Sequence, residues 1–436
     1  MSKAPEVSGG PRRLDARGIP PREALRSLRR PDGYLSDKVR EASRSIVADV
    51  RDRGDAALQE YTERFDGVRP DPIRVPDEEI ARARKELPGE LEESLRVAIE
   101  NVRAFHEREL STSGWAMSLD GAVVGQKVRP VGRAGIYVPG GHGSYPSTLV
   151  MSAVPARVAG VGEISVCVPP GPDGKVDDTV LAVADMLGIG EVYAVGGAQA
   201  VGAMAYGTDT VPAVDKIVGP GNDYVIAAKL EVFGVCGVDA PKGPSELVVI
   251  ADENADPEET SLDLMAQAEH LSGASTVLVT PSAELIDAVE PRLSGEPSDW
   301  ITLVLVADLD AAVGLTDLYA PEHAHVLTAD ADGVAGRITK AGMVAVGRWS
   351  PVALGDYAAG PSHALPTGGA AAYSSAISTH EFLVRTNYIR HDRGSVSRLG
   401  PHVERLARLE GFTNHAESVA VRVRESETRE EEADDT

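Results

Sequence analysis

The spacing of apolar residues indicates that the chain begins with helices. Between residues 36 and 110, apolar side chains recur at helical intervals, so that each helix would bury one face. The clearest such face consists of Leu91, Leu95, Ala98, Val102 and Phe105. Pro88 breaks the segment ahead of this helix. The sequence therefore predicts a helical segment from Ser36 to Leu110.

From Arg133 onward, short apolar stretches that end near glycine alternate with helical stretches. The first set of expected strands is Gly135–Val138, Glu163–Val168, Glu191–Val195 and Lys216–Val218. The second set is Leu247–Ala251, Thr276–Thr280, Ile301–Ala307, His325–Leu327 and Met343–Val346. Strands that alternate with helices form parallel sheets. We therefore predict an α/β fold with two doubly wound parallel-sheet units, at about 137–245 and 246–377, and expect the early helices to pack with the second unit.

The end of the chain has a different pattern. After Thr379 it becomes polar and helical again, and residues 419–423 form a short apolar alternation. The last residues, ESETREEEADDT, contain no large apolar group, so a disordered acidic tail is expected. The predicted organisation is an N-terminal arm at 1–32, an α/β domain that joins 33–136 to 246–377, a Rossmann-like domain at 137–245, a C-terminal segment at 378–424 and the tail at 425–436.

Composition and charge narrow the class of protein. The 436 residues are too many for one small core, which agrees with several domains. The net charge of -24 would repel nucleic acid and anionic membranes. Cys167 and Cys236, the only cysteines, lack the CxxC spacing, cannot form a thiolate zinc site alone and are expected to be buried. No apolar run has membrane-spanning length and no signal peptide is visible, so a cytoplasmic protein is expected.

Three glycine corners follow expected strands of the first set. They are Val138-Pro-Gly-Gly141, Val195-Gly-Gly-Ala-Gln199 and Val218-Gly-Pro-Gly-Asn222. Ligands of parallel sheets bind at the carboxyl ends of the strands, and glycine followed by a helix N-terminus favours phosphate. None of the corners has the GxGxxG pattern of a standard dinucleotide site. A single corner predicts only a tight turn, whereas three in one sheet are compatible with a nucleotide site.

Polar residues that could carry chemistry are scattered over the second half of the chain. Gln267 and His270 are three apart in the helical stretch Leu262–His270, which would place both on one face and could begin a zinc site. Spacing alone favours a helix-end histidine beside a solvated glutamine. Glu322 and His323 form a compact acid/base pair, although such neighbours also occur in ordinary loops.

Two further groups follow near the end of the chain. Asp356 and His363 lie in a glycine-rich stretch, Gly355-Asp-Tyr357 and Gly360-Pro-Ser-His363, which could line a site. Glu410 and His415 are five residues apart, so they would not stack on one helix and would be solvated surface residues. Local patterns therefore indicate pieces of a nucleotide-and-metal site without pairing them.

In combination, these motifs resemble those of the histidinol dehydrogenase family over residues 36–423. The most similar blocks are Tyr61–Gly67, Gly135–Gly141, Val195–Ala200, Lys216–Asp223, Gly243–Asp252, Ala266–His270, Ala320–His323, Gly355–Gly369 and Glu410–Ser418. Several blocks in the same order and at the same separations are a much stronger signal than any one motif. The resemblance implies oxidation of L-histidinol through histidinaldehyde to L-histidine, the last step of histidine biosynthesis, with zinc and two NAD.

The resemblance also assigns residues. It implies that zinc, one ion per subunit, is bound by Gln267, His270, Asp356 and His415. It implies that Glu322 and His323 are the catalytic acid/base pair, and that NAD contacts Tyr137, Gln199 and Asn222. The implied substrate contacts are Ser245, His363 and Glu410, together with His323 and the zinc ligands Gln267, His270, Asp356 and His415. Zinc and catalysis would thus belong to 33–136 with 246–377, and NAD to 137–245.

The resemblance further implies a homodimer with intertwined C-terminal segments. Glu410 and His415 would then reach the site of the partner subunit, and residues 378–424 would be a dimerisation segment. The expected partners are thus the small-molecule substrate and a second copy of the chain, with no nucleic acid and no membrane.

Two alternatives remain at this point. A paralogous zinc- and NAD-dependent dehydrogenase of another small alcohol, such as a sulfonated diol, would share the fold and the metal site. An anionic substrate would need basic groups near Glu410, where only Arg405 and Arg408 are close in sequence, so the acidic Glu410 favours the cationic histidinol. A non-catalytic nucleotide-binding protein would leave the four implied zinc ligands without a role.

Overall fold

The computed structural model describes residues 10–28, 35–110, 114–140, 143–270 and 274–434. The chain divides into two compact units. The first, called the core unit, contains residues 1–110 and 131–382, and the second, called the terminal unit, contains residues 111–130 and 383–436. Parallel sheets with many helices confirm the α/β class that the hydrophobic pattern predicts.

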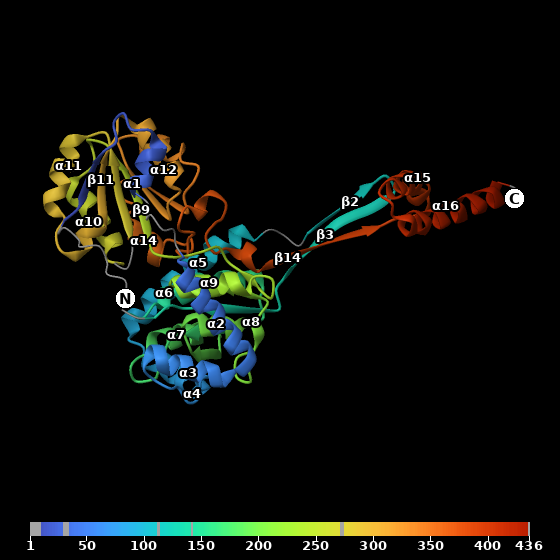
Figure 1. Cartoon of the computed structure of the whole chain (residues 1–436), viewed down its shortest axis with the longest axis horizontal. Coiled ribbons are helices and arrows are strands. Elements are labelled where there is room, and N and C mark those ends of the chain that lie inside the picture. The colour runs from blue at the N-terminus through green and yellow to red at the C-terminus, as the bar shows by residue number, and fades with distance from the viewer. Residues whose placement is uncertain (1–9, 29–34, 111–113, 141–142, 271–273, 435–436) are drawn as a thin grey trace. The chain divides into compact units, whose positions relative to one another are not determined.

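A six-stranded parallel sheet forms one part of the core unit. Its order is β1 (Arg12–Asp15), β11 (Ile301–Leu305), β10 (Ser275–Thr280), β9 (Glu246–Ala251), β12 (His323–Leu327) and β13 (Met343–Val346). Alternate residues of each strand point to opposite faces. On one face Leu247 and Val249 join the core beneath α10 (Pro257–Ala268) and α11 (Ala283–Val289), and on the other Val248 joins α1 (Pro21–Leu28) and α12 (Leu309–Tyr319). Helices on both faces make this sheet doubly wound (Figure 1).

A five-stranded parallel sheet forms the other part of the core unit. Its order is β6 (Glu191–Ala194), β5 (Glu163–Val168), β4 (Arg133–Tyr137), β7 (Lys216–Val218) and β8 (Gly237–Val238). The helices that alternate with its strands along the chain are α6 (Pro146–Ala159), α7 (Asp178–Met186), α8 (Gly197–Tyr206) and α9 (Asp223–Val232). All nine predicted strands are thus present, each with ends within about two residues of the predicted ones. The two cysteines are free and buried, as predicted.

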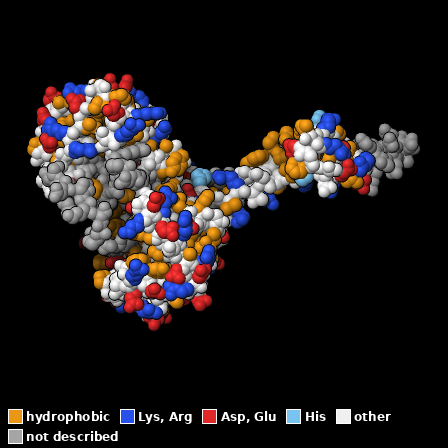
Figure 2. Space-filling model, in the orientation of Figure 1, with side chains coloured by type: hydrophobic (Ala, Val, Ile, Leu, Met, Phe, Trp, Pro, Cys, Tyr) orange, Lys and Arg blue, Asp and Glu red, His pale blue; other side chains and the backbone are white. Residues whose placement is uncertain are grey.

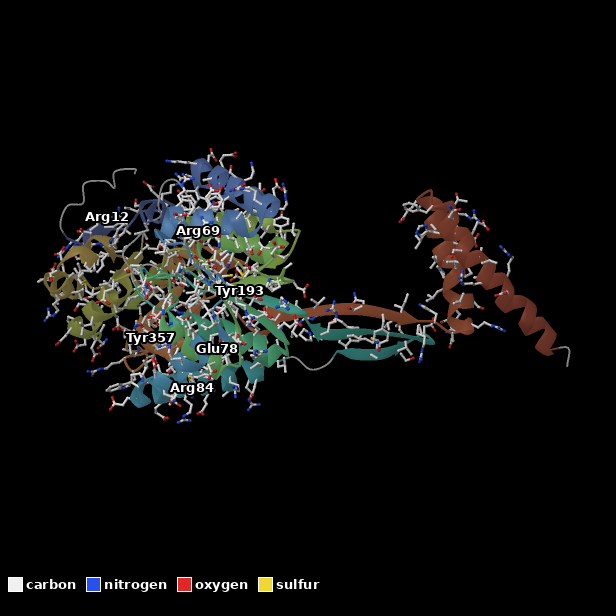
Figure 3. The ribbon with its side chains drawn as sticks, turned by 90° about the horizontal axis from the view of Figure 1, so that it is seen from below. Arg12, Arg69, Glu78, Arg84, Tyr193 and Tyr357 are labelled. Carbon is white, nitrogen blue, oxygen red and sulfur yellow. The ribbon has the colours of Figure 1, made fainter. Side chains whose placement is uncertain are left out.

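The early helices do not pack where the sequence pattern placed them. They are α2 (Asp37–Arg53), α3 (Asp55–Asp66), α4 (Asp77–Glu86) and α5 (Gly89–Glu109). Helix α2 contacts α8 and α9, α4 contacts α7, and α5 contacts α6, so these helices cover the five-stranded sheet. The reason lies in α8, where Gly202 lets Val47 and Val50 of α2 approach closely. The predicted domain of 33–136 with 246–377 is therefore wrong in its first half. Figure 3 labels Glu78 and Arg84 of α4 and Tyr193 of β6 in this part of the core unit.

One further feature of the core unit differs from the prediction. Residues 12–15 are no free arm, because β1 pairs in parallel with β11 at the edge of the six-stranded sheet. This strand, of sequence RRLD, is too polar to be recognised from its pattern. Short helices complete the unit: α13 (Ala331–Ala335), α14 (Val352–Tyr357), and the 3-10 turns η1 (Glu290–Arg292), η2 (Glu296–Trp300), η3 (Ala370–Ala372) and η4 (Thr379–Phe382).

The terminal unit combines a small antiparallel sheet with two helices. The sheet order is β14 (Leu383–Arg390), β3 (Ala122–Pro130) and β2 (Trp115–Leu119), and the helices are α15 (Arg393–Leu409) and α16 (Thr413–Asp434). Gly400 lets the helices approach closely, since an added Cβ would lie 2.2 Å from the Val423 side chain. Residues 111–130 thus join the C-terminal segment instead of an α/β domain.

The end of the chain is helical throughout its described part. The alternation at 419–423 lies within α16, and residues 425–434 continue that helix instead of forming the predicted disordered tail. Glutamate, which makes up five of residues 425–434, is a good helix former despite its charge. None of the described helices has both the length and the apolar character needed to cross a membrane.

Candidate active site

A cavity of about 530 Å³ in the core unit brings together segments that are far apart in the sequence. Its walls come from two glycine corners, from the connection that leads into β9, and from the loops around α14. Eight of the residues selected from the sequence line it: Asn222, Ser245, Gln267, His270, Glu322, His323, Asp356 and His363. The cavity is therefore the candidate active site.

Two residues selected from the sequence, Tyr137 and Gln199, are not among the described residues that line this cavity. They lie together behind the second glycine corner. The Tyr137 hydroxyl accepts a hydrogen bond of 3.1 Å from the Gly197 amide. Gln199 is buried, and its Oε1 atom has no hydrogen-bond partner among the described residues. Gly141 of the first corner lies outside the described residues. Glu410 ends α15 and His415 lies in α16, both in the terminal unit.

The acid/base pair lies at the start of a buried strand. Glu322 precedes β12 and His323 is its first residue, directly opposite Leu247 of β9. One Glu322 oxygen accepts the Glu246 amide at 2.8 Å and lies 3.6 Å from His323 Nδ1. His323 Nδ1 is also 3.3 Å from the Glu246 carbonyl. Both side chains are buried, so the neighbouring strand fixes their positions.

The electrostatics of the cavity centre on His323. Its other ring nitrogen, Nε2, lies 3.3 Å from an Asp356 carboxylate oxygen. Burial would lower the pKa of His323, but the carboxylates of Glu322 and Asp356 outweigh burial and raise the pKa to about 10. Burial would likewise raise the pKa of Asp356, but His323, His363 and His270 hold it below its ordinary value. Asp356 is therefore a carboxylate at neutral pH.

His363 is fixed by two contacts of its ring nitrogens. Its Nδ1 lies 2.6 Å from the Asp356 carbonyl, and its Nε2 lies 3.3 Å from the Thr148 hydroxyl of α6. Burial lowers the pKa of His363, which keeps this ring neutral at neutral pH. Tyr357, next to Asp356 and labelled in Figure 3, lines the cavity with a largely exposed side chain. The wall thus offers a neutral imidazole beside a carboxylate.

Gln267 and His270 approach the cavity from the end of α10. Gln267 is buried in the last turn, whereas His270 lies two residues beyond the helix and is exposed. The helical stretch predicted to reach His270 is therefore shorter than expected, and the two residues reach the same cavity from a helix and from the turn that follows it. No group of three or more His, Cys, Asp or Glu side chains within the described residues is placed to hold a metal ion.

Three contributors to the site were not selected from the sequence. Glu246 supplies the amide that holds Glu322, Thr148 contacts His363, and Lys242 lines the cavity. A charge at the start of the apolar strand ELVVIA and a lysine between proline and glycine in APKGPS were the available signals. Thr148 gives no such signal, because its contact with His363 arises only from the position of α6 in the folded chain.

Comparisons with known proteins agree with this fold. The family model described as histidinol dehydrogenase matches residues 29–423. A histidinol dehydrogenase of Geobacillus kaustophilus is 44% identical over 414 residues, covering 92% of this chain and 98% of the relative. One of Methanothermobacter thermautotrophicus is 45% identical over 394 residues, covering 87% and 92%.

A solved structure shows the same relationship in three dimensions. The crystal structure of histidinol dehydrogenase from Elizabethkingia anophelis matches with a TM-score of 0.88 and 31% sequence identity, and the match covers 96% of this chain and 99% of that one. Sequence and fold thus agree over nearly the whole length of both proteins. The chain belongs to the histidinol dehydrogenase family.

Proposed function

We propose that this protein oxidises L-histidinol to L-histidine, with histidinaldehyde as the intermediate and two NAD as acceptors. The observation that carries the proposal is the buried Glu322–His323 pair, which shares one cavity with Gln267, His270 and Asp356. An alcohol oxidation needs a base for the hydroxyl proton, and an aldehyde oxidation also needs water to be added. The pair offers two proton-transfer groups for these two demands.

The reaction divides between the two residues. When bound, NAD accepts a hydride in each step, and zinc orients the amino alcohol of the substrate. In the first step, His323 accepts the hydroxyl proton while the carbinol carbon loses a hydride. In the second step, Glu322 takes a proton from water that adds to the aldehyde, while His323 returns its proton to the aldehyde oxygen. His323 then takes a hydroxyl proton of the hydrate as the carbon loses its second hydride.

The donor set fits zinc. Gln267 and Asp356 offer oxygen and His270 offers nitrogen, which are donors that zinc accepts. Asp356 is in the carboxylate form that a metal ligand requires. We propose His415 as the fourth ligand, supplied by a second subunit. His323 must be neutral to act as a base, and a bound cation that offset the charge of Asp356 would lower the pKa of His323.

The glycine corners fit NAD. Asn222 caps α9 through hydrogen bonds of 3.1 and 3.2 Å from the Tyr224 and Val225 amides. Gly219 has a φ of +119°, and an added Cβ would lie 2.1 Å from the Tyr137 carbonyl oxygen, so only glycine is tolerated there. Gln199 Oε1 has no hydrogen-bond partner within the part of the chain that the structure describes, which leaves a polar group for a ligand. We propose these corners as the NAD site, with Tyr137, Gln199 and Asn222 as contacts.

Substrate recognition follows from the same cavity. We propose that Ser245 and His363 contact the substrate from the core unit, together with His323 and the zinc ligands. Glu410 is proposed as the contact from the second subunit, where its charge would complement a protonated imidazole or ammonium group. A sulfonated diol would lack this complementarity.

We propose a homodimer because the terminal unit exposes a large apolar surface. All residues of β2 are exposed, among them Trp115, Met117 and Leu119. In α15 a second group of exposed apolar residues consists of Leu399, Val403, Leu406 and Leu409. Figure 2 shows hydrophobic side chains gathered on the terminal unit. Contiguous apolar surface of this kind is typical of a subunit interface.

The test of the proposed function is a count of products. We expect the zinc-loaded protein to form about two NADH per L-histidine from L-histidinol, because each of the two hydride transfers reduces one NAD. NADH is followed by absorbance and histidine by chromatography. Binding of zinc and NAD without turnover of histidinol, together with oxidation of another small alcohol, would overturn the substrate and support the paralogous dehydrogenase.

Replacing His270 with alanine is expected to weaken zinc binding by more than about a hundredfold, because it removes one of four donors. Metal content after dialysis against a chelator buffer series gives the affinity directly, without reliance on activity. The matched control is His402→Ala, which removes an exposed imidazole of α15. Equal zinc affinity in the two variants would contradict the ligand assignment.

A further inference from the structure

Three buried charges lie behind the third glycine corner. The side chains of Lys229, Asp239 and Lys242 are 5%, 0% and 2% exposed. Asp239 Oδ1 lies 2.6 Å from Lys229 Nζ, and Asp239 Oδ2 lies 3.3 Å from Lys242 Nζ. Two ammonium groups thus share one carboxylate. With two lysines and one aspartate, the cluster has one positive charge that no carboxylate of the cluster neutralises.

The Asp239 carboxylate also accepts hydrogen bonds from groups other than Lys242. Asp239 Oδ2 accepts the Gly219 amide at 3.0 Å, while Lys229 donates both to Asp239 Oδ1 and to the Gly219 carbonyl. Burial would raise the pKa of Asp239, but Lys229, Lys242 and the Gly219 amide hold it low, so it remains charged. Lys229 and Asp239 therefore form a structural clamp on the peptide of Gly219.

Lys242 has a different position. Its Nζ atom makes no hydrogen bond within the described part of the chain, although all three of its N–H groups are donors. Leaving a buried cation without hydrogen-bond partners is costly, so proteins keep such groups where a ligand or a metal site uses them. Lys242 lines the cavity, whereas Lys229 does not. Of the two lysines, Lys242 is therefore the one at the wall of the candidate active site.

The position of Lys242 within the cavity indicates what it binds. Its carbonyl accepts the Gly221 amide at 3.3 Å, which places the residue beside the corner Gly219–Asn222. At Gly221 an added Cβ would lie 2.5 Å from the Val225 side chain, so this corner presents backbone only. Among the proposed ligands, NAD brings a pyrophosphate to such a corner, whereas histidinol brings an amine and an imidazole that a cation would repel.

We infer that Lys242 is a further cofactor-binding residue, whose ammonium group binds the pyrophosphate of the dinucleotide at the Gly219–Asn222 corner. This inference rests on the proposed use of NAD. The clamp of Lys229 and Asp239 shapes the corner, and Lys242 supplies the charge for the anion. Without the cofactor, Lys242 shares the Asp239 carboxylate with Lys229, and the bound pyrophosphate would offset the remaining positive charge.

The test is the variant Lys242→Met, which keeps the aliphatic stem and removes the charge. We expect the Kd for NAD to rise by about 10- to 100-fold, the usual effect of losing a hydrogen bond to a charged group. Inorganic pyrophosphate should compete with NAD in the parent protein and much less in the variant. The KM for histidinol should change by less than about threefold, and Lys242→Arg should retain most of the affinity. NAD binding is measured by calorimetric titration of the whole protein, with and without zinc.

Thermal unfolding separates this role from a structural one. We expect the midpoint of Lys242→Met to be unchanged or higher, because Asp239 stays paired with Lys229 and the Gly219 amide while the cost of burying a second ammonium group is removed. The exposed Lys340→Met is the matched control for the change in net charge and should alter neither NAD affinity nor stability. An unchanged NAD affinity with a lower midpoint would overturn the inference and assign Lys242 to the clamp.

Product inhibition gives a second independent outcome. If Lys242→Met weakens inhibition by L-histidine but leaves NAD and pyrophosphate affinity intact, the ammonium group contacts the product carboxylate and the inference is wrong. The titrations need no turnover. A parent protein that binds NAD but does not oxidise histidinol would therefore disprove the proposed function while leaving the role of Lys242 open to the same measurement.

Discussion

Replacing Glu322 with glutamine is expected to slow the oxidation of histidinaldehyde by about 10²- to 10⁴-fold, the usual contribution of a general base. The oxidation of histidinol to the aldehyde should change by less than about threefold, because that step needs no water. The two steps are measured separately, by single turnover with histidinol and with histidinaldehyde as the starting substrates. NADH formation reports on both.

The structure makes glutamine a conservative choice at this position. One Glu322 oxygen accepts the Glu246 amide at 2.8 Å, and the glutamine carbonyl can accept the same hydrogen bond. The volume is nearly the same, so the buried pocket is not disturbed. What disappears is the capacity to take a proton from water. The variant therefore tests the chemistry of Glu322 with little change in packing.

Two further variants sharpen the comparison. Asp252→Asn makes the same chemical change in a buried carboxylate at the other end of β9, where Asp252 accepts the Ala329 amide at 2.8 Å. It does not line the cavity, so both steps should keep their rates. His323→Asn should instead slow both steps, because each releases a hydroxyl proton. Equal losses in the two steps of Glu322→Gln would contradict the division of roles between Glu322 and His323.

The parts of the fold that could be predicted from the sequence share one property. Buried strands such as Glu163–Val168 consist almost entirely of apolar residues and end near glycine, so local pattern suffices to identify them. The strands β2 and β14 are largely exposed and β3 is mostly half-buried, so all three lack this pattern. The packing of α2 against α8 depends on contacts over long sequence separations, which periodicity does not encode. Exposure and long-range packing therefore account for the errors.

The candidate site has the same limits. The residue types of Glu322 and His323 suggested proton transfer, and the family resemblance implied that Asp356 binds zinc. No spacing rule places Asp356 3.3 Å from His323. That distance results from the order of strands in the six-stranded sheet and from the loop after β13. Lys242 was overlooked because one lysine in a short connection has no periodic signal. Its burial beside a glycine corner is visible only in three dimensions.

Mixing two inactive variants is expected to restore activity if the site is shared between subunits. His270→Ala removes a proposed ligand of the core unit, and His415→Ala removes the proposed ligand of the terminal unit. Each variant alone should lose nearly all activity, because every site lacks one ligand. In a heterodimer, one site loses both ligands and the other keeps both. Random pairing after co-expression should therefore restore about a quarter of the parent activity.

The control for this experiment pairs two variants of the same unit. His270→Ala and Asp356→Ala both affect the core unit, so in their heterodimer each site still lacks one ligand and no activity should return. Differently tagged chains allow the heterodimer to be purified and its zinc content and NADH formation to be measured. One zinc ion per heterodimer of His270→Ala with His415→Ala, and none for the control pair, is the expected pattern.

The arrangement of ligands decides the outcome of complementation. If His415 served the cavity of its own chain, the heterodimer of His270→Ala with His415→Ala would have one damaged ligand in each site, and activity would stay lost. A restored site requires that one chain supply the core unit and the other the terminal unit. The exposed apolar residues of β2 and α15 would then be buried in the same contact that delivers His415, so substitutions that charge this surface, such as Leu406→Glu, should lower dimer content and zinc content together. Loss of dimer with full zinc content would show that the metal site is complete within one chain.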